Sequence, residues 1–183
     1  MAPSSLLPPI YAITDLSLTG LSHLEQVERL IAGGATLIQL RDKGGDCQAF
    51  YQAAREVMAA RPPEVRILIN DRVDIALAVA ADGVHLGQTD LPPAVARRLL
   101  GEAAIIGFST HSLEQAEAAD QLPVDYVALG PIFPTRTKAN PSPVVGTALV
   151  SQVAGRISKP LVAIGGITLA AAPAILGAGA ASV

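Results

Sequence analysis

Short apolar runs alternate with longer segments of helical periodicity along the whole chain. The runs are rich in Val, Ile and Leu and span five residues each, which is typical of buried strands. The segments between them carry Ala, Leu, Val or Ile at three- and four-residue spacing, which predicts helices. The predicted strands are Ile10–Thr14, Leu37–Arg41, Arg66–Asn70, Gly83–Gly87, Ile105–Ser109, Tyr126–Gly130 and Leu161–Gly165. The predicted helices are Leu21–Ala32, Cys47–Ala60, Val73–Ala80, Pro93–Leu100, Leu113–Asp120, Gly146–Arg156 and Leu169–Leu176.

The order of these elements predicts an α/β fold with a parallel sheet. Short loops with Gly or Pro separate each helix from the next strand, as right-handed crossovers require. Seven strand-helix units follow one another, and Ala180–Val183 resembles the opening of an eighth strand. Because a closed barrel needs about 200 residues or more, we expect a (β/α)8 TIM barrel truncated in its eighth βα unit. Residues 1–183 should form a single domain.

Charge and apolar content limit the classes of partner. The net charge of -3 comes from 16 acidic and 13 basic residues without a run of either sign, so no basic stripe for nucleic acid or polybasic membrane patch is present. The N-terminal segment lacks the charged start of a signal sequence, and no apolar stretch approaches the ~18 residues of a membrane span. We expect a cytoplasmic protein that binds small phosphorylated molecules.

The single cysteine and the histidines give little sign of catalysis. Cys47 has no partner for an internal disulfide, and we interpret it as a small, partly buried thiol on a helix. His85 lies within a predicted strand and is expected to be a hydrogen-bonded residue of the barrel interior, whereas His23 is expected at the surface.

Polar residues gather where the predicted strands end, which is where barrels of this type bind ligands. Gln39, Arg41 and Lys43 are spaced two apart, so their side chains should point to the same face of the second strand and its extension. Two cations there indicate an anion, and phosphate is the usual one. The alternative is a solvated salt bridge with Asp42 or Asp46.

Two carboxylates follow the third and fourth strands. Asp71 comes directly after Asn70, and Asp90 follows the next strand, so both should emerge at the same edge of the sheet. Hard carboxylates at such an edge suit Mg2+, which takes one or two of them and fills its shell with water and substrate phosphate. The alternative is that each Asp caps a helix, with Pro92 and Pro93 marking one helix start.

The loop after the sixth strand is stiffened by prolines and ends in hydroxyls and cations. Thr135, Thr137 and Lys138 on this loop could saturate phosphate oxygens, although a plain connector is the alternative. Gly166, in the Gly-Gly pair after the seventh strand, would let backbone N–H groups approach an anion. Ser109 after the fifth strand is expected to hydrogen-bond a substrate or cap a helix.

These motifs together resemble the thiamine-phosphate synthase family, from residue 11 to the last residue. The motifs that carry the resemblance are Tyr11-Ala-Ile-Thr-Asp15, Ile38-Gln-Leu-Arg-Asp-Lys43, Ile69-Asn-Asp-Arg-Val-Asp74, Gly83-Val-His-Leu-Gly-Gln88 with Asp90, Gly130-Pro-Ile-Phe-Pro-Thr135 with Thr137-Lys138, and Ala163-Ile-Gly-Gly-Ile167. The resemblance implies a Mg2+-dependent transferase that joins 4-amino-2-methyl-5-(diphosphooxymethyl)pyrimidine to a thiazole ethyl phosphate, or its carboxylated precursor, and gives thiamine phosphate and diphosphate.

The resemblance also implies a role for each site residue. Asp71 and Asp90 would hold Mg2+ on the diphosphate, while Arg41, Lys43 and Lys138 would stabilise the departing diphosphate. The residues implied to contact the pyrimidine diphosphate are Gln39, Arg41, Lys43, Asn70, Ser109 and Lys138, and those implied to bind the thiazole phosphate are Thr135, Thr137 and Gly166. Two rivals are a paralogue resembling the thiazole tautomerase, and a non-catalytic barrel that binds phosphate ligands.

Overall fold

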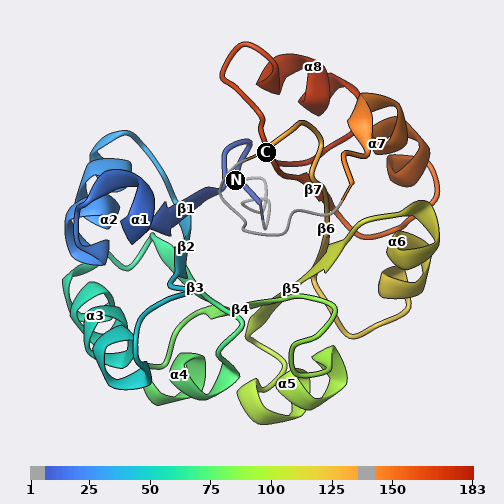
Figure 1. Ribbon diagram of the computed structural model, residues 1–183. Coiled ribbons are helices and arrows are strands. Elements are labelled where there is room, and N and C mark those ends of the chain that lie inside the picture. The colour runs from blue at the N-terminus through green and yellow to red at the C-terminus, as the bar shows by residue number, and fades with distance from the viewer. Residues whose placement is uncertain (1–6, 136–142) are drawn as a thin grey trace. The chain divides into compact units, whose positions relative to one another are not determined.

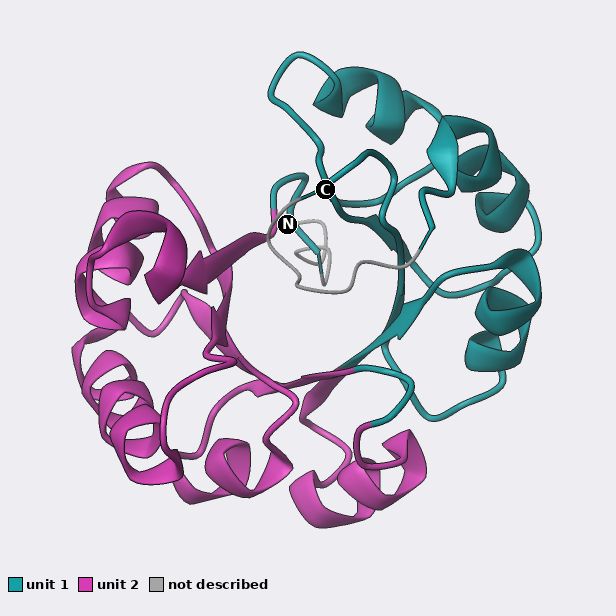
Figure 2. Cartoon of the chain, in the orientation of Figure 1, with its two compact units in different colours: residues 1–10, 87–89, 107–183 teal, residues 11–86, 90–106 magenta. Residues whose placement is uncertain are grey.

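The computed structural model describes residues 7–135 and 143–183. The chain divides into two compact units (Figure 2). The unit that we call the N-terminal unit holds residues 11–86 and 90–106. The other, the C-terminal unit, holds the described parts of residues 1–10, 87–89 and 107–183. The single domain expected from the sequence stays a prediction.

The N-terminal unit is built on parallel strands that neighbour one another in chain order. β1 pairs with β2, β2 with β3 and β3 with β4, and β5 begins in this unit beside β4. The strands are β1 (Ala12–Asp15), β2 (Leu37–Arg41), β3 (Arg66–Asn70), β4 (Gly83–Leu86) and β5 (Ile105–Thr110). The central residues of β2, β3 and β4 are buried on both faces, as expected of a parallel sheet. The parallel strand order predicted from the sequence is therefore confirmed.

Helices α2 to α5 lie on the same face of these strands (Figure 1). The helices of this unit are α1 (Leu16–Thr19), α2 (His23–Ala32), α3 (Cys47–Ala60), α4 (Val73–Ala78) and α5 (Pro93–Leu100). Helices α3, α4 and α5 bury apolar residues, which in α3 are Phe50, Ala54 and Val57, whereas α2 buries His23 and Gln26 beside Val27.

Side-chain caps fix where α1, α2 and α3 begin. Asp15 caps α1 by accepting from the backbone N–H of Ser17. The side chain of Ser22 accepts from the backbone N–H of Glu25, and the Glu25 carboxylate accepts from the N–H of Ser22. This capping box starts α2 at His23, two residues later than the apolar pattern predicts. Asp46 caps α3 with a single hydrogen bond, which its side chain accepts from the N–H of Ala49.

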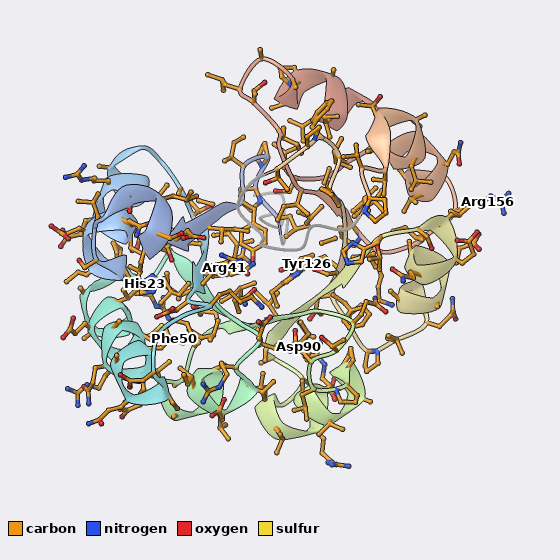
Figure 3. The ribbon with its side chains drawn as sticks, in the orientation of Figure 1. His23, Arg41, Phe50, Asp90, Tyr126 and Arg156 are labelled. Atoms are coloured by element: carbon orange, nitrogen blue, oxygen red, sulfur yellow. The ribbon has the colours of Figure 1, made fainter. Side chains whose placement is uncertain are left out.

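The C-terminal unit continues the same pattern with β5, β6 and β7. β6 pairs in parallel with β5 and with β7. Its elements are α6 (Leu113–Asp120), β6 (Tyr126–Leu129), α7 (Gly146–Ala154), β7 (Leu161–Ala163) and α8 (Ala172–Gly177). Tyr126, labelled in Figure 3, is fully buried, and its ring occupies the space above the missing side chain of Gly107.

The segment expected to open an eighth strand pairs with β7. Ser182 forms a parallel bridge to Val162, and the Ser182 carbonyl accepts from the N–H of Ala163 at 2.9 Å. The N–H of Val183 donates to the carbonyl of Pro9 at 3.0 Å. The end of the described chain therefore continues the strand order of the C-terminal unit.

His23 is buried, so its predicted surface position is wrong. Its side chain is 2% exposed, its Nδ1 lies 2.7 Å from Thr14 Oγ1, and its ring centroid lies 5.6 Å from that of Phe50. Figure 3 shows His23 and Phe50 on the helix side of the strands. Burial lowers the pKa of His23, against the opposing influence of Asp42 and Asp15. His85 is buried within β4, as expected.

No helix in residues 7–135 and 143–183 has both the length and the apolar content that crossing a membrane requires.

Replacing Gly83 by Ala should destabilise the N-terminal unit strongly. A Cβ at Gly83 would lie 1.9 Å from the backbone oxygen of Ile105, so the start of β5 would have to move. We expect a loss of about 3 kcal/mol in the free energy of unfolding, measured by urea denaturation. Gly177→Ala is the matched control, because a Cβ there meets nothing within 4 Å and the position is helical. Equal midpoints for the two variants would contradict the close strand contact.

Acidification should destabilise the fold through His23. The pKa of His23 is lower in the folded chain than its ordinary value of 6.5, so the unfolded chain takes up the proton first as the pH falls. The stability that neutral, buried His23 contributes should therefore be fully present above about pH 6.5 and be lost progressively as the pH falls below that value. In urea titrations between pH 7.5 and 5.5, His23→Gln should lose less stability on acidification than the unmodified chain, by up to about 1.4 kcal/mol per pH unit. Parallel pH profiles for the two proteins would contradict this.

Candidate functional site

Gln39 and Arg41 lie on the same face of β2, as their spacing predicts. Arg41 lies on the face opposite to the helix that carries Phe50 (Figure 3). Gln39 is 2% exposed, and its Nε2 donates to the hydroxyl of Tyr11 at 2.9 Å. The buried amide is therefore fixed by a neighbour on the segment that precedes β1.

Arg41 pairs with a carboxylate on the neighbouring strand. Arg41 and Asp15 are register partners in the β1/β2 pair, and Arg41 Nη1 lies 2.5 Å from Asp15 Oδ2. Both side chains are only 14% exposed, so the two charges compensate each other in a largely water-free position.

Lys43 pairs with Asp71 at the end of β3. The alternative of a salt bridge with Asp42 or Asp46 is therefore wrong for both cations. Asp42 instead accepts from the N–H groups of Gly44 and Gly45 in its own loop, and Asp46 caps α3. The neighbouring strands, and not the adjacent loop, supply the counter-charges of Arg41 and Lys43.

Asp71 and Asp90 are not helix caps. α4 begins after Arg72 and α5 begins after Pro92, and neither helix has a side-chain cap. Asp71 has a φ of 61°, a left-handed conformation that is costly for a residue other than glycine and that occurs often at functional sites. Its N–H donates to the carbonyl of His85 on β4 at 2.8 Å. The alternative role of capping is therefore wrong for both residues.

The two carboxylates follow strands that neighbour each other. β3 and β4 are parallel, so Asp71 and the half-buried Asp90 come after the same ends of these strands. Figure 3 labels Asp90 near the start of α5. Within the described ranges, no group of three or more His, Cys, Asp or Glu side chains comes together to hold a metal. Two carboxylates match Mg2+, which completes its shell with water and substrate oxygens.

Asn70 carries an unsatisfied donor beside these charges. Its side chain is 8% exposed, and its buried Nδ2 has no hydrogen-bond partner. Leaving a buried donor unpaired costs about 1–3 kcal/mol, so such a group calls for an explanation. A ligand oxygen at the carboxyl end of β3 would satisfy it.

The C-terminal unit holds three further predicted site residues. Ser109 lies on β5, and its backbone oxygen accepts from Gln88 Nε2 at 2.7 Å. Gly166 has a φ of 65°, and a Cβ there would lie 2.5 Å from the oxygen of Pro134, next to Thr135. The Gly-Gly turn after β7 therefore packs directly against the loop after β6. Thr137 and Lys138 lie outside the described residues.

Cys47 is exposed, so its predicted partial burial is wrong. It is the first residue of α3, and Arg72 Nη2 lies 2.8 Å from its Sγ. The same guanidinium donates to Asp74, and this hydrogen bond holds the pKa of Asp74 below its ordinary value.

Sequence reasoning missed two residues that contact the predicted site. Tyr11 accepts from Gln39, and Asp15 pairs with Arg41. Asp15 was visible as a polar residue at a strand end, but only the strand register shows that it faces Arg41.

Sequence comparisons with known proteins agree on one family. A sequence profile described as thiamine monophosphate synthase matches residues 10–183. The thiamine-phosphate synthase of Koribacter versatilis is 47% identical over 100% of this chain and 89% of its own length. That of Methanocella arvoryzae is 46% identical over 93% of this chain and 82% of its own length.

A solved structure shows the same fold. Thiamine phosphate pyrophosphorylase from Pyrococcus furiosus superimposes with a TM-score of 0.84 at 36% identity, over 94% of this chain and 82% of that one. The TIM-barrel type of fold predicted from the sequence is therefore confirmed. With the profile match and the two relatives, this similarity shows that the chain belongs to the thiamine monophosphate synthase family.

Proposed function

We propose that this protein is a thiamine-phosphate synthase that acts with Mg2+. It joins 4-amino-2-methyl-5-(diphosphooxymethyl)pyrimidine to a thiazole ethyl phosphate, or to its carboxylated precursor, and releases diphosphate, together with CO2 when the carboxylated precursor is the substrate. The relatives that carry this name are similar to the chain over nearly its whole length, which supports the proposal.

The observation that carries the proposal is the group of side chains at the ends of β2 and β3. Arg41 and Lys43 supply positive charge, Asp71 has a strained backbone, and Asn70 has a buried donor without a partner. A diphosphate with a divalent cation would satisfy the donor and pair with both cations. An ordinary structural salt bridge accounts for neither the unpaired amide nor the positive φ.

Asp71 and Asp90 would hold the Mg2+, which when bound supplies positive charge to the diphosphate oxygens. Asp71 pairs with Lys43 in this structure, so its engagement with a cation would release the Lys43 ammonium toward the diphosphate. Lys43 has a side chain that is 53% exposed, which leaves it room to turn. The cation and the released ammonium would then both add positive charge around the leaving group.

The chemistry requires no nucleophile from the protein. The bond between the pyrimidine methylene carbon and the diphosphate oxygen breaks, and its electron pair leaves with the diphosphate. The positive charge spreads over the aminopyrimidine ring, and the thiazole nitrogen donates its lone pair to the methylene carbon. Arg41, Lys43 and Lys138 would stabilise the growing negative charge of the diphosphate. Gln39, Asn70 and Ser109 would orient the pyrimidine diphosphate.

The C-terminal unit would bind the second substrate. We assign the thiazole phosphate to Thr135, Thr137 and Gly166. The contact between Gly166 and the loop that carries Thr135 supports this assignment, because hydroxyl and backbone donors come from adjacent segments. A cytoplasmic location stays a prediction.

Replacing Asp71 by Ala should abolish diphosphate release that depends on Mg2+. The variant loses a carboxylate for the cation and leaves Lys43 without its partner. We expect kcat to fall about 100-fold or more, measured as diphosphate formed from the two substrates. Calorimetric titration with Mg2+ in the presence of inorganic diphosphate should show weakened binding as well.

Asp74→Ala is the matched control for this experiment. Asp74 is three residues away, has a side chain that is 64% exposed, and pairs with Arg72. This variant should retain both activity and Mg2+ binding. If Asp71→Ala released diphosphate at the normal rate, the metal assignment would be refuted. Binding of both substrates by the unmodified chain without product would favour the non-catalytic alternative.

A further inference from the structure

Asp15, at the carboxyl end of β1, has no place in the proposed reaction although its carboxylate contacts Arg41. Its two oxygens point in different directions. Oδ2 lies 2.5 Å from Arg41 Nη1, and Oδ1 accepts from the N–H of Ser17 at 3.0 Å and from Ser17 Oγ at 2.5 Å. One oxygen therefore faces the site, and the other is held by the first turn of α1.

The backbone of Asp15 is fixed as firmly as its side chain. Its N–H donates to Gln26 Oε1 at 3.0 Å, and Gln26 Nε2 donates to the carbonyl of Leu21 at 2.9 Å. Gln26 is 7% exposed, so this contact lies in the layer between α2 and the sheet. Asp15 is thus held both by α1 and by α2, and its carboxylate has little freedom to turn.

Arg41 receives a second contact from the same strand. Its backbone N–H donates to Thr14 Oγ1 at 3.3 Å, and the same hydroxyl lies 2.7 Å from His23 Nδ1. Consecutive residues of β1 therefore contact both the main chain and the side chain of Arg41. The contact with Thr14 fixes the backbone from which the Arg41 side chain extends, and the contact with Asp15 fixes the position of its Nη1.

A guanidinium is planar and carries five N–H donors in a fixed arrangement. When one edge is held by a carboxylate, the direction of the remaining donors is set as well. At metal sites, loss of the carboxylate or carbonyl that orients a ligating side chain commonly costs 10- to 100-fold in affinity or activity, and we expect a similar magnitude for an oriented guanidinium. Arg41 needs such orientation more than Lys43 does, because an ammonium is a point charge whose direction matters less.

We propose that Asp15 is a positioning residue that orients the Arg41 guanidinium for the departing diphosphate. This inference rests on the proposed function, in which Arg41 binds that diphosphate. Asp15 itself contacts no substrate. Asp15 acts on the reaction only by orienting Arg41, and Ser17 and Gln26 hold Asp15 in place.

The direction in which Asp15→Asn changes kcat shows whether Asp15 orients Arg41 or only neutralises its charge. Asp15 is negative and lies beside an anion site, so its charge alone opposes the binding of diphosphate. If Asp15 served only to neutralise Arg41, Asp15→Asn would tighten the binding of inorganic diphosphate and leave kcat unchanged or raised. If it orients Arg41, the same variant should lose kcat, because the transition state depends on donor direction more than the bound ground state does.

The kinetic test compares Asp15→Asn with the unmodified chain. We expect kcat to fall about 10- to 100-fold and KM for the pyrimidine diphosphate to change by less than about threefold. In an Arg41→Gln background, Asp15→Asn should cost less than about twofold, since its effect passes through Arg41. An undiminished loss in that background, or an unchanged kcat in the single variant, would overturn the inference.

Asp82→Asn is the matched control for loss of an ion pair. Asp82 Oδ2 lies 3.2 Å from Arg61 Nη2, with side chains that are 16% exposed for Arg61 and 26% exposed for Asp82. The pair lies where β4 begins, at the opposite end of the strands from Arg41. Asp82→Asn should reduce the stability of the fold and leave kcat unchanged. Ser17→Ala removes one contact to Asp15 without changing any charge, and it should lower kcat about two- to fivefold.

A measurement that needs no turnover tests the orientation directly. Nuclear magnetic resonance of the arginine guanidinium nitrogens should show restricted rotation for Arg41, assigned by its loss in Arg41→Lys. This signal should collapse to free rotation in Asp15→Asn and persist in Asp82→Asn. If rotation stays restricted in Asp15→Asn, the inference fails whatever the activity. If the unmodified chain forms no product while the signal behaves as expected, the proposed function fails and the positioning of Arg41 by Asp15 stands.

Discussion

The end of β2 carries two positively charged side chains, Arg41 and Lys43, and the fold pairs each of them with a carboxylate from a neighbouring strand. Asp15 on β1 faces Arg41, and Asp71 after β3 faces Lys43. Parallel pairing makes this possible, because the carboxyl ends of consecutive strands lie at the same edge of the sheet. Residues that are register partners on neighbouring strands therefore lie side by side. Without these partners the largely buried guanidinium of Arg41 would be costly to hold in place. The sheet therefore keeps its cations in position before any phosphate is bound.

The two ion pairs differ in ways that suit different tasks. Arg41 and Asp15 are each 14% exposed, and Asp15 is held by further hydrogen bonds, so this pair has a fixed geometry. Lys43 is 53% exposed, and its partner Asp71 has a positive φ. Under the proposed function Asp71 exchanges its ammonium partner for a divalent cation, whereas Asp15 keeps its guanidinium throughout. Under the proposed function the largely buried, fixed Arg41 would orient the leaving group, and the more exposed Lys43 would add positive charge as the negative charge of the diphosphate grows.

The sequence predicted the regular elements well because their apolar periodicity is strong. β2, β3, α3, α5 and α6 have the predicted limits. α1 was missed because four residues carry no helical period, and α2 starts late because a capping box, not an apolar residue, marks its start. His23 was placed at the surface because a single polar residue at a helix start has no periodic signal, and only the packing of α3 against it shows that it is buried. The counter-charges of Arg41 and Lys43 were sought nearby in sequence, while the real partners lie 26 and 28 residues away along the chain.

Strand register decides which of the polar residues at the strand ends lie close enough to form a site. Once β1 and β2 are aligned, Asp15 must lie beside Arg41, and this alignment follows from the apolar runs plus one fixed pair. For Asp71 and Asp90, helix capping and ligand binding were predicted from the sequence as mutually exclusive roles of one carboxylate. Asp15 shows that the choice is not exclusive, because one of its oxygens caps α1 while the other holds Arg41. A carboxylate at the junction of a strand and a helix can therefore stabilise the helix start and orient a site residue at once, and the cap supplies the rigidity that orientation needs.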